Sequence, residues 1–356
     1  MISYIIPTRN RHEMLASTLQ RLGSLTRHRA EVIIIDNAST QPAAADSVLP
    51  NGLSVQLLHR KSNEGTAARN VGARASDPSS SWLIMLDDDS YPLNTSFLAN
   101  LATRTPSVAV VMADIHLPRL NKREDGGLPE VFIGCGVAIR RDAFLRCAGY
   151  DAAFGYYVEE YDLAAKLILK NYHIEFDRNF QVHHLKDNLN RDMNLICERL
   201  VRNNGWVMQR YSPEEVRRPQ LREIRSRYRR IATRENAIAG FSRGLIELRK
   251  TIQLQTRKPM STRQFERFIG LSAAREALSA AFARSPFRSA TLVNEGKNSS
   301  VIRAAMYDLG ITESADGEAR IIGTMSPGPM LDAQQAHPDW IAPWAMAQLR
   351  SRSIAA

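Results

Sequence analysis

The sequence predicts an α/β fold with a mainly parallel sheet between helices, followed by a mostly helical C-terminal region. Over residues 1–118, short apolar runs alternate with helix-period segments, which is typical of a parallel sheet with crossover helices. Beyond about residue 190 the segments become helix-like and rich in arginine. We therefore expect one domain over residues 1–190 and a second region over residues 191–356.

The first predicted strand is ISYIIPT, which ends at Pro7, and a helix is expected at RHEMLASTLQRLGSL. The next strand, AEVIIID, is continuously apolar, as expected for a strand buried on both faces. Two further strands are predicted at VQLLHR and SWLIMLDDD, on either side of the small-residue helix GTAARNVGARAS.

Residues 108–186 are expected to contain strands, loops and one clear amphipathic helix at VEEYDLAAKLILKNY. HIEFDRNFQVHHLKD is expected to form two short extended pieces. After Ser285 the sequence predicts one helix at SVIRAAMYDLG, one strand at IIGT and a loop at SPGPM. The segment NEGKNSS is similar to a phosphate loop but lacks its first glycine, so we do not assign it that function.

The formal net charge of +10 over 356 residues favours an anionic partner: a nucleotide, a phospholipid surface or a nucleic acid. The segment Arg217 to Arg234 contains eight arginines and one glutamate. A solvated helix face is the commoner interpretation of such a run, and a membrane-surface or partner-binding helix is the alternative.

The protein is expected to be cytoplasmic. Its three cysteines have neither metal-site spacing nor an even count, which suggests a reducing compartment. There is no signal-peptide pattern and no apolar run of the roughly 18 to 20 residues needed to cross a bilayer. Peripheral contact with the inner face of the membrane stays open.

Polar side chains follow three of the predicted buried strands. Thr8 and Arg9 follow the first strand, Asp36 follows the second, and Asp87 to Asp89 follow the fourth. In open parallel sheets, ligands bind at the carboxyl ends of the strands, where helix N-termini present free N–H groups. We therefore expect one cleft at this edge of the sheet.

The three adjacent aspartates are candidates for a metal site. Carboxylates suit hard cations such as Mg²⁺ or Mn²⁺, and one aspartate can bind the metal while another binds a ribose hydroxyl or a metal-bound water. A solvated acidic turn or a helix cap is the structural alternative. His183 and His184 can complete a metal–diphosphate site if the fold brings them to the aspartates, although a single histidine is more often structural.

Acidic residues also precede the amphipathic helix, at Glu159, Glu160 and Asp162. Acids in the first turn favour the helix dipole, which is a sufficient structural explanation for one of them. A general base needs a carboxylate that faces a cleft, and Tyr156 and Tyr157 would raise its pKa and bind a ring-shaped acceptor. We expect one acid to act in chemistry while its neighbour caps the helix.

Further residues can bind a nucleotide sugar. Asp36 can accept a hydrogen bond from a nucleobase, and Arg9, Arg69 and the NEG turn at residues 63–65 can bind phosphates. Arg69 could equally be an exposed helix arginine. Gly134 and Gly136 would let the backbone approach a sugar, or would mark a bulge in a strand.

Seven segments in order resemble glycosyltransferase family 2, whose members are inverting enzymes with the nucleotide-binding GT-A fold. The resemblance covers about residues 1–190. The segments are IIPTRNR, VIIIDNAS, NEGTAARNVGA, WLIMLDDDSYP, GCGVAIRRDAF, EEYDLAAKL and VHH.

The resemblance implies a role for each matching residue. The family's Glu–Asp pair, whose aspartate is the base, corresponds here to Glu159–Glu160, so Glu160 or Glu159 would be catalytic. Asp162 matches an acid that supports the start of the helix. The implied metal ligands are Asp87, Asp89 and His183, with His184 as an alternative. The implied nucleotide-sugar contacts are Pro7, Thr8, Arg9, Asp36, Asn63, Gly65, Arg69, Asp87, Asp88, Gly134 and Gly136.

The implied reaction is the transfer of a sugar from a nucleoside-diphosphate donor to an acceptor hydroxyl, with inversion and with Mg²⁺ or Mn²⁺. The acceptor would be a saccharide or another hydroxyl compound, and a lipid-linked acceptor and a homo-oligomer stay open. No nucleic-acid partner is expected. The alternatives are a sugar-nucleotide-forming nucleotidyltransferase, whose glycine-rich N-terminal loop is missing, and a non-catalytic nucleotide- or nucleic-acid-binding protein.

Overall fold

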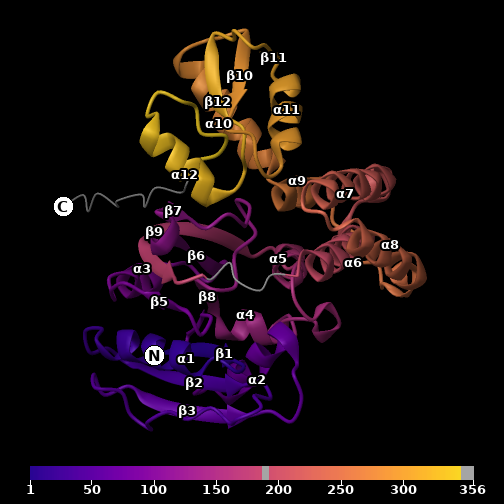
Figure 1. Ribbon diagram of the computed structural model, residues 1–356. Coiled ribbons are helices and arrows are strands. Elements are labelled where there is room, and N and C mark those ends of the chain that lie inside the picture. The colour runs from indigo at the N-terminus through magenta and orange to yellow at the C-terminus, as the bar shows by residue number, and fades with distance from the viewer. Residues whose placement is uncertain (187–191, 346–356) are drawn as a thin grey trace, which may run out of the picture.

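A nine-stranded sheet with helices on both faces forms the N-terminal part of the structure, which is a computed structural model describing residues 1–186 and 192–345 (Figure 1). A group of helices lies to one side of this sheet, and a second, three-stranded sheet lies above it in the view. The predicted domain boundary between residues 190 and 191 lies outside the described residues.

The large sheet has the strand order β3-β2-β1-β4-β8-β6-β9-β5, and β7 pairs with β6. Strands β1 to β4 pair in parallel, as do β6 and β9, while β5, β7 and β8 run antiparallel to their neighbours. The mixed α/β fold with a mainly parallel sheet is confirmed. The strands are β1 Ile2–Thr8, β2 Ala30–Asp36, β3 Ser54–His59, β4 Trp82–Met85, β5 Ser90–Pro92, β6 Val108–Leu117, β7 Lys122–Arg123, β8 Val137–Arg140 and β9 His173–His184.

Both faces of the sheet are buried, as the continuous apolar strands predicted. In β2, Val32 and Ile34 pack with helices α1 and α3, whereas Ile33 and Ile35 pack with α2, α4 and α5 on the other face. These helices are α1 His12–Gly23, α2 Ala68–Ala75, α3 Phe97–Thr103, α4 Arg141–Arg146 and α5 Glu159–Leu169, with short 3₁₀ turns η1 Gly65–Ala67, η2 Pro118–Leu120 and η3 Ala152–Phe154.

The next part of the chain is helical, as predicted. Helix α8 packs closely on α6 because Gly240 and Gly244 face its backbone: a Cβ atom at Gly240 would lie 1.9 Å from the carbonyl oxygen of Asn194. The helices are α6 Met193–Tyr211, α7 Glu214–Arg234, α8 Ile238–Thr251, α9 Thr262–Ile269 and α10 Leu271–Arg284, with the 3₁₀ turn η4 Ile252–Leu254.

The C-terminal segment contains more sheet than the sequence predicted. Strands β10 Ser289–Val293, β11 Thr312–Glu313 and β12 Ala319–Ile322 form a parallel sheet in the order β11-β10-β12, with helices α11 Ser299–Asp308 and α12 Pro327–Ala336. Strand β10 escaped prediction because only Ala290 in it is buried, which leaves no apolar pattern. SPGPM was predicted as a loop but begins α12, since proline is well tolerated in the first turn of a helix.

Strand β9 is one 12-residue strand rather than two short extended pieces. Its pairing with β6 shifts between Ala113 and Asp114, so the strand continues through the irregularity. His183 and His184 are therefore neighbours within a strand and point to opposite faces. This alternation decides which histidine can reach a site at the sheet edge.

Among the described residues, every helix is too short or too polar to span a lipid bilayer.

Candidate functional site

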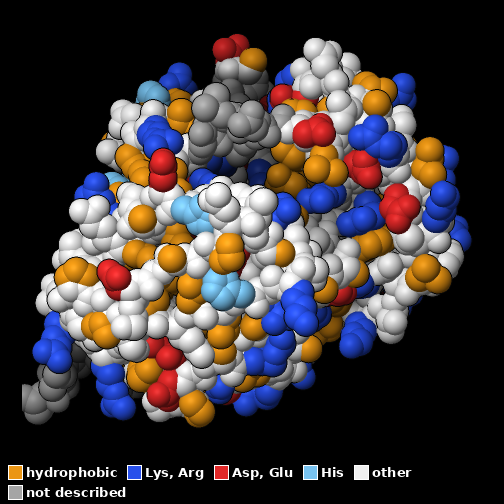
Figure 2. Space-filling view, turned by 60° about the horizontal axis from the view of Figure 1, so that its bottom comes forward, with side chains coloured by type: hydrophobic (Ala, Val, Ile, Leu, Met, Phe, Trp, Pro, Cys, Tyr) orange, Lys and Arg blue, Asp and Glu red, His pale blue; other side chains and the backbone are white. Residues whose placement is uncertain are grey.

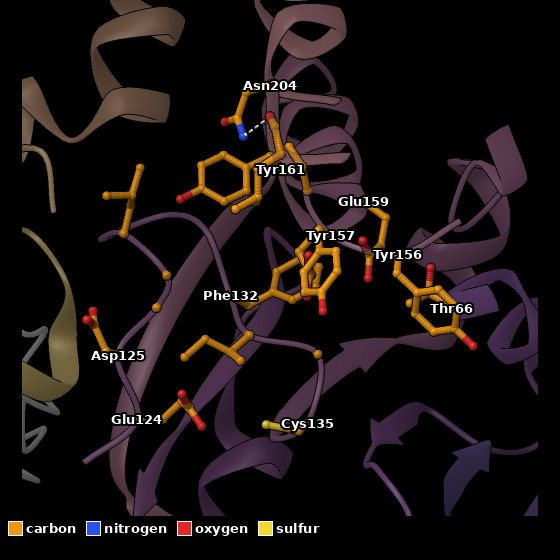
Figure 3. Close-up of a pocket in the computed structure, with 18 of the residues that line it drawn as sticks. Thr66, Glu124, Asp125, Phe132, Cys135, Tyr156, Tyr157, Glu159, Tyr161 and Asn204 are labelled. Carbon is orange, nitrogen blue, oxygen red and sulfur yellow. Dashed lines mark hydrogen bonds between the residues drawn. The ribbon is translucent and has the colours of Figure 1, made fainter. Parts of the chain in front are cut away.

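A cavity of about 700 Å³ opens at the carboxyl ends of β1 and β4. One wall comes from these strand ends and the residues after them, and a second comes from the loop 124–135 and the start of α5. The far wall comes from α7, the α9–α10 junction and the segment between β10 and α11. Figure 3 shows Tyr156, Tyr157 and Tyr161 around the Glu159 side of the cavity, with Glu124 and Cys135 across from them.

The cavity brings together most of the residues that the sequence selected, from segments up to 180 positions apart. Those that line it are Pro7, Thr8, Arg9, Gly65, Arg69, Asp87, Asp88, Gly134, Glu159, Glu160 and His184. Those that lie outside its lining are Asp36, Asn63, Asp89, Gly136 and His183.

Each of the three aspartates has a cationic partner. Asp87 pairs with Arg69, a buried residue of α2 that also donates to the Leu86 carbonyl at 3.1 Å. The guanidinium of Arg11 spans the other two, with 2.7 Å from Nη2 to Oδ2 of Asp89 and with Asp88 on Nη1. The acidic turn is therefore neither a solvated turn nor a helix cap.

Asp88 and Asp89 differ in the pKa that their surroundings produce. Burial raises the pKa of Asp88 to about 7, although Arg11 and the Thr8 hydroxyl oppose this effect. Burial would also raise the pKa of Asp89, but His184 and Arg11 outweigh it and lower that pKa to about 2. Only Asp89 of this pair is firmly ionised at neutral pH.

His184, and not His183, points into the cavity. The Nε2 atom of His184 lies 3.3 Å from Oδ1 of Asp89, and its Nδ1 atom lies 2.8 Å from Glu124. His183 packs against the rings of Tyr91 and His116 on the opposite face of β9. This placement corrects the assignment of His183. That assignment rested on a match of single residues and did not consider that neighbouring side chains of a strand point to opposite faces.

The donor atoms around Asp87 fit a divalent cation. Oxygen of Asp87, nitrogen of His184 and sulfur of Cys135 lie within 4.8 Å of one another. Burial raises the pKa of the Cys135 thiol. Burial would lower the pKa of His184, but its contacts with Cys135, Asp89 and Glu124 outweigh this and raise it, so a cation bound here would displace a proton from each of these two groups. Oδ1 of Asp89 is buried, and its polar contact within the described residues is the His184 ring at 3.3 Å. Asp87 and His184 are therefore the donors in this group suited to Mg²⁺ or Mn²⁺.

The two glutamates at the start of α5 form no ion pair with a cationic side chain of residues 1–186 and 192–345. Glu159 is buried, and its Oε2 atom lacks a hydrogen bond within the described part of the chain. Burial, with the neighbouring charge of Glu160, raises the pKa of Glu159 well above its ordinary value. Burial also raises the pKa of Glu160, but its own backbone N–H, Arg69 and Lys297 counteract this.

The segment before these glutamates is strained and held from α6. Tyr157 and Val158 both have positive φ angles, 71° and 73°, which are rare for residues other than glycine. The two N–H groups of the buried Asn203 amide are shared among three backbone carbonyls of this segment, with Nδ2 3.1 Å from Phe154, 3.2 Å from Tyr156 and 2.7 Å from Tyr157. Asn203 thereby fixes the direction in which α5 presents its acids.

Asp162, one turn further along α5, is structural. It is fully buried and accepts hydrogen bonds from Arg210 at 2.8 Å and from the Tyr211 hydroxyl at 2.7 Å, and it pairs with Lys166. These contacts join the start of α5 to the end of α6.

Three residues that were expected to contact the nucleotide sugar instead make contacts within the protein, beside the cavity. Asp36 accepts the N–H groups of Ser39 and Ala43, both at 2.9 Å, and contacts His59. Asn63 accepts the N–H group of Gly65 at 3.0 Å and so shapes the turn whose glycine lines the cavity. Gly136 leaves no room for a side chain, since a Cβ atom there would lie 2.8 Å from Ile115. Gly134 differs, because a Cβ atom there would lie 3.3 Å from Oε1 of Glu160.

Several cavity residues were not selected from the sequence. Arg11 is the last residue of the IIPTRNR segment, whereas no sequence motif surrounds Glu124. The polar and aromatic residues in this group include Arg11, Glu124, Asp125, Cys135, Tyr161, Lys186, Asn204, Arg227, Tyr228, Lys297 and Asn298.

Residues 3–111 match the family model described as Glycosyl transferase family 2. A curated relative, an uncharacterized glycosyltransferase of Haemophilus influenzae, is 25% identical over 193 residues, which are 47% of this chain. The match covers 62% of that relative, so the chain spans less than two thirds of its length.

Solved structures also share distant similarity with the chain. Mannosyltransferase PcManGT from Pyrobaculum calidifontis, in complex with GDP-Man and Mn²⁺, is 16% identical with a TM-score of 0.45, over 80% of each chain. S. aureus TarS 1-349 in complex with UDP-GlcNAc is 15% identical with a TM-score of 0.49, over 87% of this chain and 92% of that one.

Proposed function

We propose that this chain, whose residues 3–111 match the glycosyl transferase family 2 model, transfers a sugar from a nucleoside-diphosphate donor to an acceptor hydroxyl with inversion. One observation supports this most directly. The same cavity is lined by two possible metal ligands, Asp87 and His184, and by a pair of glutamates, Glu159 and Glu160. A single displacement needs both a stabilised leaving group and a base, and it needs no enzymic nucleophile.

Glu160 is the base in this proposal. It must be ionised to take the proton of the acceptor hydroxyl. Burial raises the pKa of Glu160, and the charges of Arg69 and Lys297 oppose this rise and favour the ionised form. Glu159 is more deeply buried and has no cation at ion-pairing distance among the described residues, so it stays protonated. Two adjacent buried glutamates cannot both carry charge cheaply, which assigns the proton of the pair to Glu159.

The donor binds at the carboxyl ends of β1 and β4. Thr8, Arg9 and the backbone around Gly65 lie where a nucleotide would pass the strand ends. Asp87 and His184 would hold the divalent cation, which supplies positive charge to the departing diphosphate. Arg69 keeps Asp87 oriented from the buried side.

A thermal-shift screen tests the donor half of the proposal. UDP, GDP, ADP and CDP are added to the full chain with and without Mn²⁺, and one of them should raise Tm only when the metal is present, since a ligand that binds the native state stabilises it. Transfer is then measured with sugar nucleotides of that base. Absence of stabilisation by all four nucleotides would refute the proposal, and nucleotide binding without turnover on any donor would favour a non-catalytic binding protein.

We also propose that α7 docks on an anionic lipid surface. Arg218, Arg222, Arg225 and Arg229 are exposed at i, i+4, i+7 and i+11, and so share one helical face. None of the four forms a hydrogen bond or ion pair through its side chain within residues 1–186 and 192–345. Lysine and arginine side chains also gather on the right-hand side of Figure 2, the side on which α7 and α8 lie in Figure 1.

Vesicle sedimentation tests this docking surface. The chain should bind vesicles of phosphatidylcholine with 30 mol% phosphatidylglycerol and not pure phosphatidylcholine, and binding should weaken with salt, since each basic residue near such a surface contributes about 1 kcal/mol. Replacing the four arginines by glutamine should remove the difference between the two vesicle types. Unchanged sedimentation of that variant would contradict the assignment of α7.

A further inference from the structure

The loop after β10 and the first turn of α11, which adjoin the second sheet, reach the cavity. Lys297, Asn298, Ser300 and Val301 line the cavity although they lie more than a hundred residues beyond the matched family segment. The loop is tied to the one after β12: Gly296 donates its N–H to the Gly323 carbonyl at 3.0 Å, and Met325 donates to the Lys297 carbonyl at 2.9 Å. Both loops leave the carboxyl ends of parallel strands, where ligands of such sheets bind.

Lys297 is a cation without a carboxylate at ion-pairing distance in the described part of the chain. Its Nζ atom lies over the ring of Tyr161, 5.2 Å from the centroid. Burial would lower the pKa of Lys297, but Tyr161, Tyr228 and Asp125 outweigh it, so the pKa is raised and the ammonium keeps its charge. A charge held in a partly desolvated wall is costly unless an anion pairs with it.

A second cation reaches the same wall from α7. Arg227 donates from Nη1 to the Asn298 side-chain oxygen at 3.1 Å, which joins α7 to the Lys297 loop. Its Nε atom is buried without a hydrogen bond within the described residues, and its nearest carboxylate, Glu223, is 4.0 Å away. Arg227 therefore keeps hydrogen-bonding capacity for a ligand.

The position of this wall relative to the base indicates which substrate it meets. Tyr161, against which Lys297 lies, directly follows Glu160 in α5, and the charge of Lys297 acts on Glu160. The donor residues Thr8 and Arg9 belong to the opposite side, at the ends of the large sheet. A hydroxyl attacking from the side of Glu160 would arrive along the wall formed by Lys297 and Arg227.

We propose that Lys297 and Arg227 form an acceptor subsite that binds an anionic group, a carboxylate or a phosphate, on an acceptor sugar, with Tyr161 and Tyr228 beside the sugar ring. This inference rests on the proposed glycosyl transfer. It gives the small C-terminal sheet a function: it supplies the acceptor side of the cavity while the large sheet supplies the donor side.

Binding of matched probes tests the subsite. p-Nitrophenyl glucuronide and p-nitrophenyl glucoside differ by one carboxylate, and glucose 6-phosphate against glucose tests the phosphate in the same way. Calorimetry is done on the full chain, saturated with the nucleotide and Mn²⁺ where the screen identifies one. At least one anionic probe should bind about 10- to 100-fold more tightly than its neutral partner, as expected for charge-assisted hydrogen bonds.

The variant Lys297→Met should abolish this preference, Lys297→Arg should retain most of it, and Arg230→Met, at an exposed position of α7, should leave it unchanged. Equal binding of neutral and anionic probes by the wild type would overturn the inference. So would a loss of nucleotide stabilisation in Lys297→Met as large as in Asp87→Asn, since Lys297 would then be a donor residue. A different result would refute the proposed glycosyl transfer itself: no nucleotide would raise the Tm of the wild type.

Discussion

The aspartate cluster 87–89 and the glutamate pair 159–160 are both runs of adjacent acids in one cavity, yet their surroundings are opposite. Arg69, Arg11 and His184 pair directly with the three aspartates. The glutamates have no direct ion pair among the described residues, and burial raises the pKa of both. The cations around the aspartates favour their charged forms, although burial still raises the pKa of Asp88, whereas the surroundings of the glutamates favour the protonated form.

This difference teaches that a run of acids does not reveal its chemistry. The environment of each carboxylate decides it: cations and hydrogen bonds favour the charged form, and desolvation favours the neutral form. Adjacent positions can differ as strongly as distant ones, since the pKa of Asp88 is about 7 and that of Asp89 about 2.

The largest expected effect separates the two clusters by function. Glu160→Gln should lower kcat by about 10²- to 10⁴-fold, because the acceptor hydroxyl loses its general base. Nucleotide-dependent stabilisation should persist in this variant, since no donor contact is removed. Glu159→Gln, the matched control, should retain more activity because a protonated glutamate resembles glutamine. A larger loss in Glu159→Gln would exchange the roles of the two residues.

A smaller effect is expected at the metal-binding side. Asp87→Asn and His184→Ala should each weaken Mn²⁺-dependent nucleotide binding by about 10- to 100-fold or more, taking the effect of a disturbed metal shell as a guide. Asp89→Ala should likewise weaken both transfer and nucleotide binding. Titration calorimetry with and without Mn²⁺ measures this.

The adjacent histidines provide a control for the metal side. His183→Ala removes the same group from the other face of β9 and should leave nucleotide affinity unchanged. If the two histidine variants behaved alike, the assignment of His184 would be wrong.

The pH profile sharpens the contrast further. The raised pKa of the glutamate pair means that the base becomes protonated at a pH above the ordinary glutamate value of 4.5. Below the apparent pKa of the pair, kcat/KM should fall about tenfold per pH unit, and it should level off above it. The residual activity of Glu160→Gln should lack this limb. A wild-type limb at or below pH 4.5 would show that the pair is not desolvated during catalysis.

Asn203→Ala tests how the strained segment holds the glutamates. The variant loses the hydrogen bonds from the Asn203 amide to residues 154–157 and should lose about 2 kcal/mol of stability, with kcat reduced more than donor affinity. Urea unfolding and kinetics measure the two effects. Asn51→Ala, which removes bonds to the Leu22 and Leu25 carbonyls, should lose stability without a change in kcat.

The smallest effect concerns Asp36. Like Asp89 in the aspartate cluster, and unlike the two glutamates, its carboxylate is stabilised in the ionised form. Its pKa is lowered from 3.8 to about 2 because hydrogen bonds outweigh burial. The corresponding stabilisation, about 2 kcal/mol, is present above pH 4 and is lost as the pH falls to about 2. Unfolding of Asp36→Asn should show this much less acid dependence than the wild type, and equal acid dependence would contradict it.

Local patterns in the sequence were enough to predict much of the large sheet. Apolar runs such as AEVIIID are buried on both faces, and the polar residues after β1 and β4 meet at one edge, as parallel pairing requires. Strand β10 and the position of His184 could not be predicted, because the first lacks a buried pattern and the second depends on where β9 begins and on its irregular pairing.

The sequence by itself determined the fold class, the family segment and the candidate acids, because periodicity, strand ends and motif order are local properties. Only the tertiary structure decided which acids are charged, which histidine faces the cavity and that Lys297 and Arg227 join it. Those properties depend on burial and on charges contributed by segments far apart in the chain, and no spacing along the sequence encodes them.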